Sequence, residues 1–211
     1  SFLNPDLDRD VADLYLLKDM NVAVERVNKA LRNKERVLVY GDYDVDGITG
    51  VAIMVTVLRK LGLDPMPYLP DRTSDGYGLS REVLEELSDQ FDLLITVDCG
   101  VSNGPEIDYL KKIKKEVIVT DHHNFTKGLP EALAVLHPRH SGGNYPFAWL
   151  SGAGVAWSFA RALLGNEKNI ERCVLETMAL ACLGTVADSV PLVGENRAIA
   201  VSYTHLTLPT T

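Results

Sequence analysis

The stretch ERVLVYGDYDVDG, residues 35–47, indicates the fold, because a short apolar run ends there in a turn with three aspartates at alternate positions. Two later stretches have the same form: FDLLITVDCG (91–100) and VIVTDHH (117–123). Short runs rich in Val and Ile, with helical patterns between them, are typical of buried parallel strands. The three runs therefore predict strands of one parallel sheet, each with an acidic residue at its carboxyl end.

The segments around these strands predict helices and one weaker strand. Two prolines in 65–69 predict an edge strand, and the Pro- and Gly-containing stretch 124–150 is expected to be irregular. Helices are predicted at 8–17, 20–33, 48–61, 80–87, 103–115, 151–164 and 169–183. Strands that alternate with helices indicate the α/β class, as a doubly wound, mostly parallel sheet with flanking helices.

Length and composition suit one domain. The chain has 211 residues, of which 46% are hydrophobic, enough for one α/β domain with its own core. That domain is expected to span residues 1–200, with N-terminal helices in 1–34. Residues 201–211 are neutral, rich in threonine and fit no helix face, so they are predicted to be a non-native tail.

The chain is predicted to be cytoplasmic and to have no membrane partner. Its apolar runs fall short of the roughly 20 residues that cross a bilayer, and the opening SFLNP lacks the basic and apolar regions of a signal peptide. Three scattered cysteines do not make a disulfide framework and are expected to be reduced thiols. The net charge of −8 disfavours a broad nucleic-acid surface, so any grip on phosphates is local or lies outside this chain.

The acidic strand ends predict a metal site. Ligands of an open α/β sheet bind at the carboxyl ends of its strands, so acids distant in sequence are expected to converge there. Carboxylates that face one cleft repel each other, and they and the histidines beside them lose hydration. Bound divalent cations usually offset both costs.

Three other interpretations of the acids were weighed. An EF-hand calcium loop needs Glu at its twelfth position, which is Ile53 when counted from Asp42. A phosphatase with an aspartyl nucleophile leaves residues 121–123 without a role. A solvated acidic turn remains the simplest alternative for 42–47, and Asp98 by itself could merely cap a helix.

Histidines and a helix-terminal acid refine the prediction. Imidazole among carboxylates moves the expected metal from Mg²⁺ towards Mn²⁺. His122 and His123 are adjacent and point in different directions, so one is expected to bind metal and the other to contact substrate or donate a proton. Asp188 ends an apolar helix that Pro191 stops, where an acid is unfavourable to the helix dipole. This misfit indicates a ligand role.

Substrate contacts are predicted in loops and at one helix start. Arg72 and Arg139 lie in loops that could overhang the cleft, and each is a candidate phosphate contact. Ser151 and Gly152 open a helix with small residues. Such residues let a phosphate approach free backbone N–H groups, or let two helices pack closely, and the sequence leaves both alternatives open.

Together these motifs resemble those of the DHH phosphoesterase superfamily, and further stretches are similar to its RecJ branch of single-stranded-DNA exonucleases. The superfamily motifs are matched by 42–47, 98–100, 121–123 and 187–188. The RecJ-like stretches are 70–72 with 76–80, 145–147 with 150–156, and 183–188 with 190–197. The resemblance runs from residue 2 to 199 and is specific, because separated stretches agree in order.

The resemblance implies a two-metal hydrolase that uses Mn²⁺ or Mg²⁺ as a 5′→3′ exonuclease on single-stranded DNA in repair and recombination. The implied metal ligands are Asp44 and Asp46, one to each ion, Asp98 as the bridging carboxylate, and His122 and Asp188 on the second ion. His123 matches a contact to the substrate phosphate. Asp42 belongs to the RecJ form of the first motif, and Arg72 completes the catalytic candidates.

The chain departs from the pattern at Tyr40, where some family members carry a histidine, which implies a first metal that is held more weakly or differently. The resemblance also implies a second domain that these 211 residues do not include, and single-strand-binding protein or helicase partners. Two alternatives stay open: a phosphodiesterase for short oligonucleotides or cyclic dinucleotides, and an inactive DHH domain that serves as a binding module.

Overall fold

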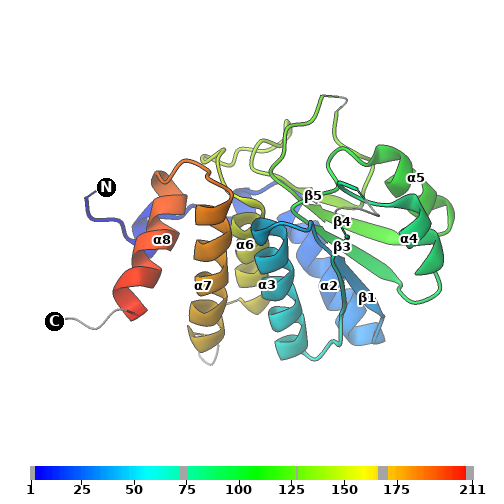
Figure 1. The fold of residues 1–211 in the computed structure, drawn as a ribbon. Helices are drawn as coiled ribbons and strands as arrows, with labels where there is room; N and C mark the ends of the chain where they lie inside the picture. Colours follow the sequence, from blue (N-terminus) through cyan, green and yellow to red (C-terminus); the bar gives the residue numbers. More distant parts are fainter. Residues whose placement is uncertain (1–2, 72–75, 127, 166–170, 208–211) are drawn as a thin grey trace.

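A five-stranded parallel sheet forms the centre of the molecule (Figure 1). The computed structural model describes residues 3–71, 76–126, 128–165 and 171–207. The strands are β1 (Val37–Tyr40), β2 (Met66–Tyr68), β3 (Leu93–Val97), β4 (Glu116–Thr120) and β5 (Ala134–Leu136). Their order is β2-β1-β3-β4-β5, and every neighbouring pair is parallel. The predicted fold class is therefore confirmed.

Helices cover both faces of the sheet. The helical elements are α1 (Leu7–Asp10), the 3-10 turn η1 (Leu14–Leu16), α2 (Met20–Asn33), α3 (Val45–Leu61), α4 (Arg81–Glu86), α5 (Gly104–Lys112), α6 (Gly152–Leu164), α7 (Glu171–Ala187) and α8 (Gly194–Thr207). Helices α2, α3 and α6 cover one face, α4 and α5 cover the other, and α7 and α8 extend the first layer outward (Figure 1).

Alternate strand residues enter two separate cores. Val37, Val39 and Ile95 pack with α3 and α6, whereas Leu38 and Leu94 pack with α4 and α5. Both faces of the central strands are buried, which explains why their sequence is a continuous apolar run without polar alternation.

The N-terminal segment differs from the single helix predicted at 8–17. The side chain of Asp6 caps α1 by accepting from the Arg9 N–H, and the helix ends at Asp10. A second acidic cap, at Asp13, accepts from the Tyr15 N–H and starts the short turn η1. Two caps in one apolar pattern therefore divide the segment, since each cap residue takes a non-helical conformation.

Strand β5 was missed because residues 124–150 were expected to be irregular. It has three residues, all buried, and lies beside β4 with Val135 opposite Val119. A run this short carries no periodic signal of its own. Its pairing with β4 decides its conformation.

Other helices also differ from prediction: α5 ends at Lys112 rather than 115, α7 continues to Ala187 rather than 183, and α8 was not predicted. Helix α3 begins at Val45 rather than 48, because the Asp44 carboxylate accepts from the Gly47 N–H at 3.0 Å and caps it. Helix α8 continues to Thr207, so the expectation that 201–211 fit no helix is wrong for 201–207. Tyr203 packs against the larger core. Residues 208–211 lie outside the described residues, and the non-native origin of the tail stays a prediction.

Gly50 allows α3 to lie directly on β3. A Cβ at this position would lie 2.4 Å from Val97 Cγ1. We expect Gly50→Ala to destabilise the fold by about 1–3 kcal/mol through overpacking, although Gly→Ala inside a helix usually stabilises by roughly 1 kcal/mol. Urea unfolding at equilibrium measures the difference. Gly104→Ala is the matched control, since no atom lies within 4 Å of its Cβ, and a Gly50→Ala protein as stable as this control would contradict the expectation.

Candidate metal centre

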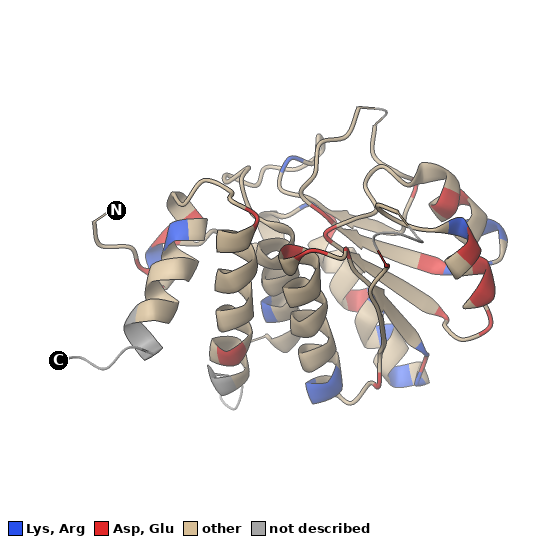
Figure 2. Ribbon diagram, in the orientation of Figure 1, with Lys and Arg blue, Asp and Glu red and all other residues tan. Residues whose placement is uncertain are grey.

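The acidic residues after the strands converge at one edge of the sheet. Asp42 and Asp44 follow β1, Asp98 follows β3, and residues 121–123 follow β4. Asp46 lies in the first turn of α3 and Asp188 directly after α7. Figure 2 shows acidic segments in red at the start of α3, at the end of α7 and on the loops beside the strand ends.

Two groups of potential ligand atoms form at this edge. Oxygen atoms of Asp42, Asp44 and Asp98 lie within 4.8 Å of one another. Atoms of Asp46, His122 and Asp188 do the same, and Asp98 also groups with His122 and His123. Asp98 therefore lies between the two groups. The residues that the resemblance assigned to the two ions are brought together in this arrangement.

Several of these atoms are buried without a hydrogen bond: Asp42 Oδ1, Asp98 Oδ1 and His122 Nε2. His122 Nε2 lies 3.2 Å from Asp98 Oδ1, 3.6 Å from Asp188 Oδ2 and 3.8 Å from Asp46 Oδ2. A buried polar atom without a partner costs about 1–3 kcal/mol. Divalent cations would satisfy these atoms, and oxygen ligands with one imidazole suit Mn²⁺ or Mg²⁺.

Burial makes four of the carboxyl groups harder to ionise. Burial, followed by repulsion from Asp46, raises the pKa of Asp98 to about 10. Burial also raises the pKa of Asp42, Asp46 and Asp188, and it lowers the pKa of His122. A cation that binds here must displace protons from the carboxyl groups.

The backbone aims Asp98 at the centre. Asp98 takes a left-handed conformation with φ 61° and donates its N–H to Thr120 O at 2.9 Å. Such a conformation is uncommon for non-glycine residues and tends to occur at functional sites. Helix α6 approaches from the other side, where a Cβ on Gly152 would lie 2.5 Å from Asp98 Cγ.

The start of α6 holds Asp46. The Gly152 N–H donates to Asp46 Oδ2 at 2.5 Å, and the Ala153 N–H donates to Asp46 Oδ1 at 3.0 Å. Ser151 Oγ accepts from the Gly154 N–H at 3.1 Å. Of the two alternatives for Ser151 and Gly152, the structure has the close packing of two helices, α6 against α3. The N–H groups of Gly152 and Ala153 donate to Asp46 and are therefore not available to a phosphate.

Asp121 organises the two histidines. Its Oδ1 accepts from the His122 N–H at 2.7 Å and the His123 N–H at 3.0 Å, and its Oδ2 accepts from the Val101 N–H at 2.9 Å. His123 Nδ1 lies 2.9 Å from Asp121 Oδ1. Asp121 was not among the predicted site residues, although its place beside two histidines after a buried strand was a usable signal.

His123 is a cation at neutral pH. Burial lowers its pKa, but the hydrogen bond and charge of Asp121, with Asp98 and Asp188, outweigh burial and raise the pKa to about 9. Its side chain is 37% exposed, and Nδ1 lies 3.7 Å from Asp98 Oδ1. A positive, accessible imidazolium thus borders the two ligand groups.

Comparison with known proteins identifies the family of the chain. The sequence model of the DHH family, N-terminal domain, matches residues 36–185. The chain belongs to the DHH family. It is 40% identical over 194 residues to the single-stranded-DNA-specific exonuclease RecJ of Bacillus subtilis, covering 92% of this chain and 24% of that protein. For the Thermus thermophilus protein of the same name, the identity is 42%, with 92% of this chain and 28% of the relative covered.

A solved structure agrees with the DHH fold found here. The crystal structure of exonuclease RecJ bound to manganese superposes with a TM-score of 0.80 at 40% identity, over 92% of this chain and 49% of that chain. The present chain spans about a quarter of the length of the two relatives above.

Two residues singled out in the sequence of this DHH domain serve other purposes. Arg139 was predicted to overhang the cleft as a phosphate contact, but its Nη1 donates to Asn124 Oδ1 at 2.6 Å and its Nη2 donates to His122 O. Tyr40 is buried among the residues packed with α4 and α5, and its hydroxyl donates to Gly78 O at 3.2 Å. Arg72 lies outside the described residues.

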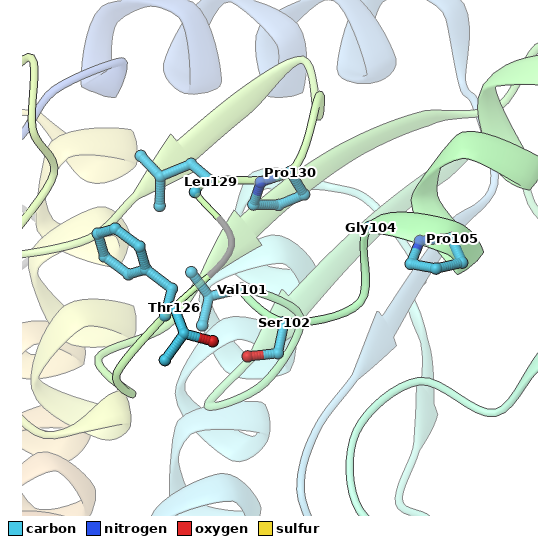
Figure 3. Close-up of a pocket in the computed structure, with 9 residues that line it drawn as sticks. Val101, Ser102, Gly104, Pro105, Thr126, Leu129 and Pro130 are labelled. Carbon is cyan, nitrogen blue, oxygen red and sulfur yellow. The ribbon is translucent and has the colours of Figure 1, made fainter.

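A cavity of about 350 Å³ (Figure 3) is lined by Val101, Ser102, Gly104, Pro105, Phe125, Thr126, Gly128, Leu129 and Pro130. The hydroxyls of Ser102 and Thr126 face each other across it in that view. None of the potential metal ligands lines it. Asp44 is the exposed member of the ligand groups, and His123 and Asp188 are partly exposed.

Titration calorimetry should find two Mn²⁺ ions bound per DHH domain. Asp98→Asn should weaken both, because Asp98 lies between the groups, and Asp188→Asn should weaken one. We expect a loss of at least about 10-fold, the lower limit for removing even an outer-shell partner of a metal. Asp64→Asn, at a side chain 94% exposed, is the control. A single ion, or an Asp98→Asn protein with normal affinity at both sites, would refute the shared-ligand geometry.

Mn²⁺ should stabilise the domain more at pH 8 than at pH 6. A group whose pKa is higher in the folded state than in the unfolded state contributes stability at low pH that is lost as the pH rises. Asp98, with a pKa of about 10, and His123, with a pKa of about 9, both act in this direction. The free energy of unfolding of the metal-free domain therefore falls from pH 6 to pH 8. Over the same range, fewer protons compete with Mn²⁺ for the ligand atoms. Differential scanning calorimetry with and without Mn²⁺ measures both effects, and an equal gain in Tm at the two pH values would contradict this expectation.

Proposed function

We propose that this domain hydrolyses phosphodiester bonds of single-stranded DNA, as the catalytic domain of a RecJ-type exonuclease. The observation that carries the proposal is the pair of ligand groups at the sheet edge, which meet where Asp98 Oδ1 of one group lies 3.2 Å from His122 Nε2 of the other. Relatives that match nearly the whole chain are named single-stranded-DNA-specific exonucleases, and one such structure is described as bound to manganese. We assign the catalytic domain to residues 1–200.

The residues around Asp98 divide between two ions, Mn²⁺ or Mg²⁺. Asp42, Asp44 and Asp98 would hold one, and Asp46, His122 and Asp188 the other, with Asp98 close to both. When bound, two such ions supply a metal-activated water as nucleophile and stabilise the charge that develops on the phosphate.

The protein's own groups prepare the site for an anionic substrate. His123 carries a positive charge held by Asp121 and is accessible from solvent, so it can donate a charge-assisted hydrogen bond to a phosphate oxygen. Arg72 is proposed as a second phosphate contact. Arg139 is removed from this set, because its guanidinium binds the backbone of His122.

The remaining parts of the proposal rest on the resemblance and on composition. With a net charge of −8, this domain has little general attraction for DNA, so we place most of the strand-binding surface in the parts of the relatives that this chain does not span. The 5′→3′ polarity, a role in repair and recombination, and single-strand-binding protein or helicase partners are proposed on the same ground.

We propose a cytoplasmic location. All three cysteines are free, as expected in a reducing compartment. Within the described ranges, the helices are all too short or too polar to cross a membrane.

Hydrolysis should require Mn²⁺ and single-stranded DNA. We expect release of mononucleotides from a labelled 20-mer, abolition by Asp98→Asn, and a loss of about 10²–10³ in kcat for His123→Ala, the range for removing one donor to a developing oxyanion. Asp64→Asn is the control. Dinucleotides and cyclic dinucleotides run in parallel test the alternative substrates: cleavage of these with none of the 20-mer would replace the exonuclease proposal, and cleavage of none with Mn²⁺ bound would favour a binding module.

A further inference from the structure

The backbone of His122 and His123 is held on two sides. Asp121 takes the N–H groups, as described above. The carbonyl groups are taken by residues that follow β5: Arg139 Nη2 donates to His122 O, and His137 Nε2 lies 2.9 Å from His123 O. Every backbone N–H and C=O of the two histidines therefore has a partner outside that pair.

The tautomer of His137 follows from its neighbours. Its Nδ1 accepts from the Arg139 N–H at 3.0 Å, so this nitrogen carries no proton. Nε2 is then the protonated nitrogen, and it donates to His123 O. His137 is 1% exposed, and the ring of Phe125 stands edge-on to it at 5.2 Å. One rigid orientation results.

Arg139 fixes the same loop at a second point. Its Nη1 donates to Asn124 Oδ1 at 2.6 Å while Nη2 holds the His122 carbonyl. The fork of a guanidinium suits two acceptors at fixed separation, which an ammonium group cannot reproduce. His137 and Arg139 are two residues apart and reach consecutive carbonyls, so together they clamp residues 122–124.

We propose that His137 and Arg139 are positioning residues of the metal centre, which hold the His122–His123 backbone so that His122 Nε2 points at Asp46, Asp98 and Asp188. The inference rests on the proposed function in that these groups bind metal. Partners behind a ligating histidine fix its ring orientation and affect metal affinity by about 10–100-fold. The clamp acts on the carbonyl side of the ligand, opposite to Asp121.

The test compares variants that remove the hydrogen-bond donors of His137 and Arg139 with a variant that keeps a donor at position 137. His137→Leu removes the hydrogen bond to His123 O, whereas His137→Gln keeps an N–H donor near the position of Nε2. Arg139→Met removes both guanidinium contacts, and Arg59→Met, an exposed arginine at the end of α3, is the matched control. Each change is made in Asp42→Asn and in Asp188→Asn backgrounds, which isolate one ligand group each. Mn²⁺ affinity is read by calorimetry and by the free-ion EPR signal.

In the Asp42→Asn background, His137→Leu and Arg139→Met should weaken Mn²⁺ binding by about 10–100-fold, and His137→Gln should restore most of the loss. In the Asp188→Asn background the same changes should have little effect. Equal weakening in both backgrounds with a lowered Tm would mean a general structural role and overturn the proposal. Unchanged affinity would also overturn it while leaving the proposed function intact. Failure of the unmodified chain to bind Mn²⁺ would instead refute the proposed function and this inference together.

Discussion

Electrostatic repulsion among the carboxylates at one edge of the parallel sheet is the main constraint on this structure. Two charges 4 Å apart repel by about 1 kcal/mol in water and by roughly 4 kcal/mol near a protein surface. Seven potential ligand residues share this edge in three groups of neighbouring atoms. The surrounding elements hold them in place: Asp44 caps α3, Asp46 is held by two N–H groups of α6, and Asp98 is fixed by a left-handed backbone.

Asp98 and Asp121 show how hydrogen bonds divide roles between two buried carboxylates. Both follow central strands and both are about 1% exposed. Burial alone raises the pKa of each. At Asp121, hydrogen bonds from His123 and from backbone N–H groups outweigh burial and lower the pKa, so it is a stable anion that orients its neighbours. Asp98 Oδ1 has no hydrogen bond, and its pKa rises to about 10. A bound cation would stabilise the Asp98 carboxylate as the hydrogen-bond donors stabilise that of Asp121.

The sheet, most helices and the convergence of the ligands could be predicted from the sequence, because they depend on local patterns. Val37–Tyr40 and Leu93–Val97 are continuous apolar runs, and parallel strands place their carboxyl ends at one edge whatever the loops do. Helix α2 follows its periodicity from Met20 to Asn33 as predicted. Strand β5 has no such pattern in Ala134–Leu136. It forms because β4 offers an unpaired edge, and it carries His137 and Arg139 to the back of the metal centre.

The sequence by itself determined which chemical groups meet at the sheet edge and which metals suit them, since residue type and the parallel direction of the strands are enough for both. Only the tertiary structure decided how each group is used. Arg139, a predicted phosphate contact, donates to the His122 carbonyl instead. At Ser151 and Gly152 the sequence left a phosphate site and close helix packing both open, and in the structure the N–H groups of Gly152 and Ala153 donate to Asp46. A side chain's partner depends on what packs within about 3 Å of it, and those neighbours come from segments that lie far away along the chain.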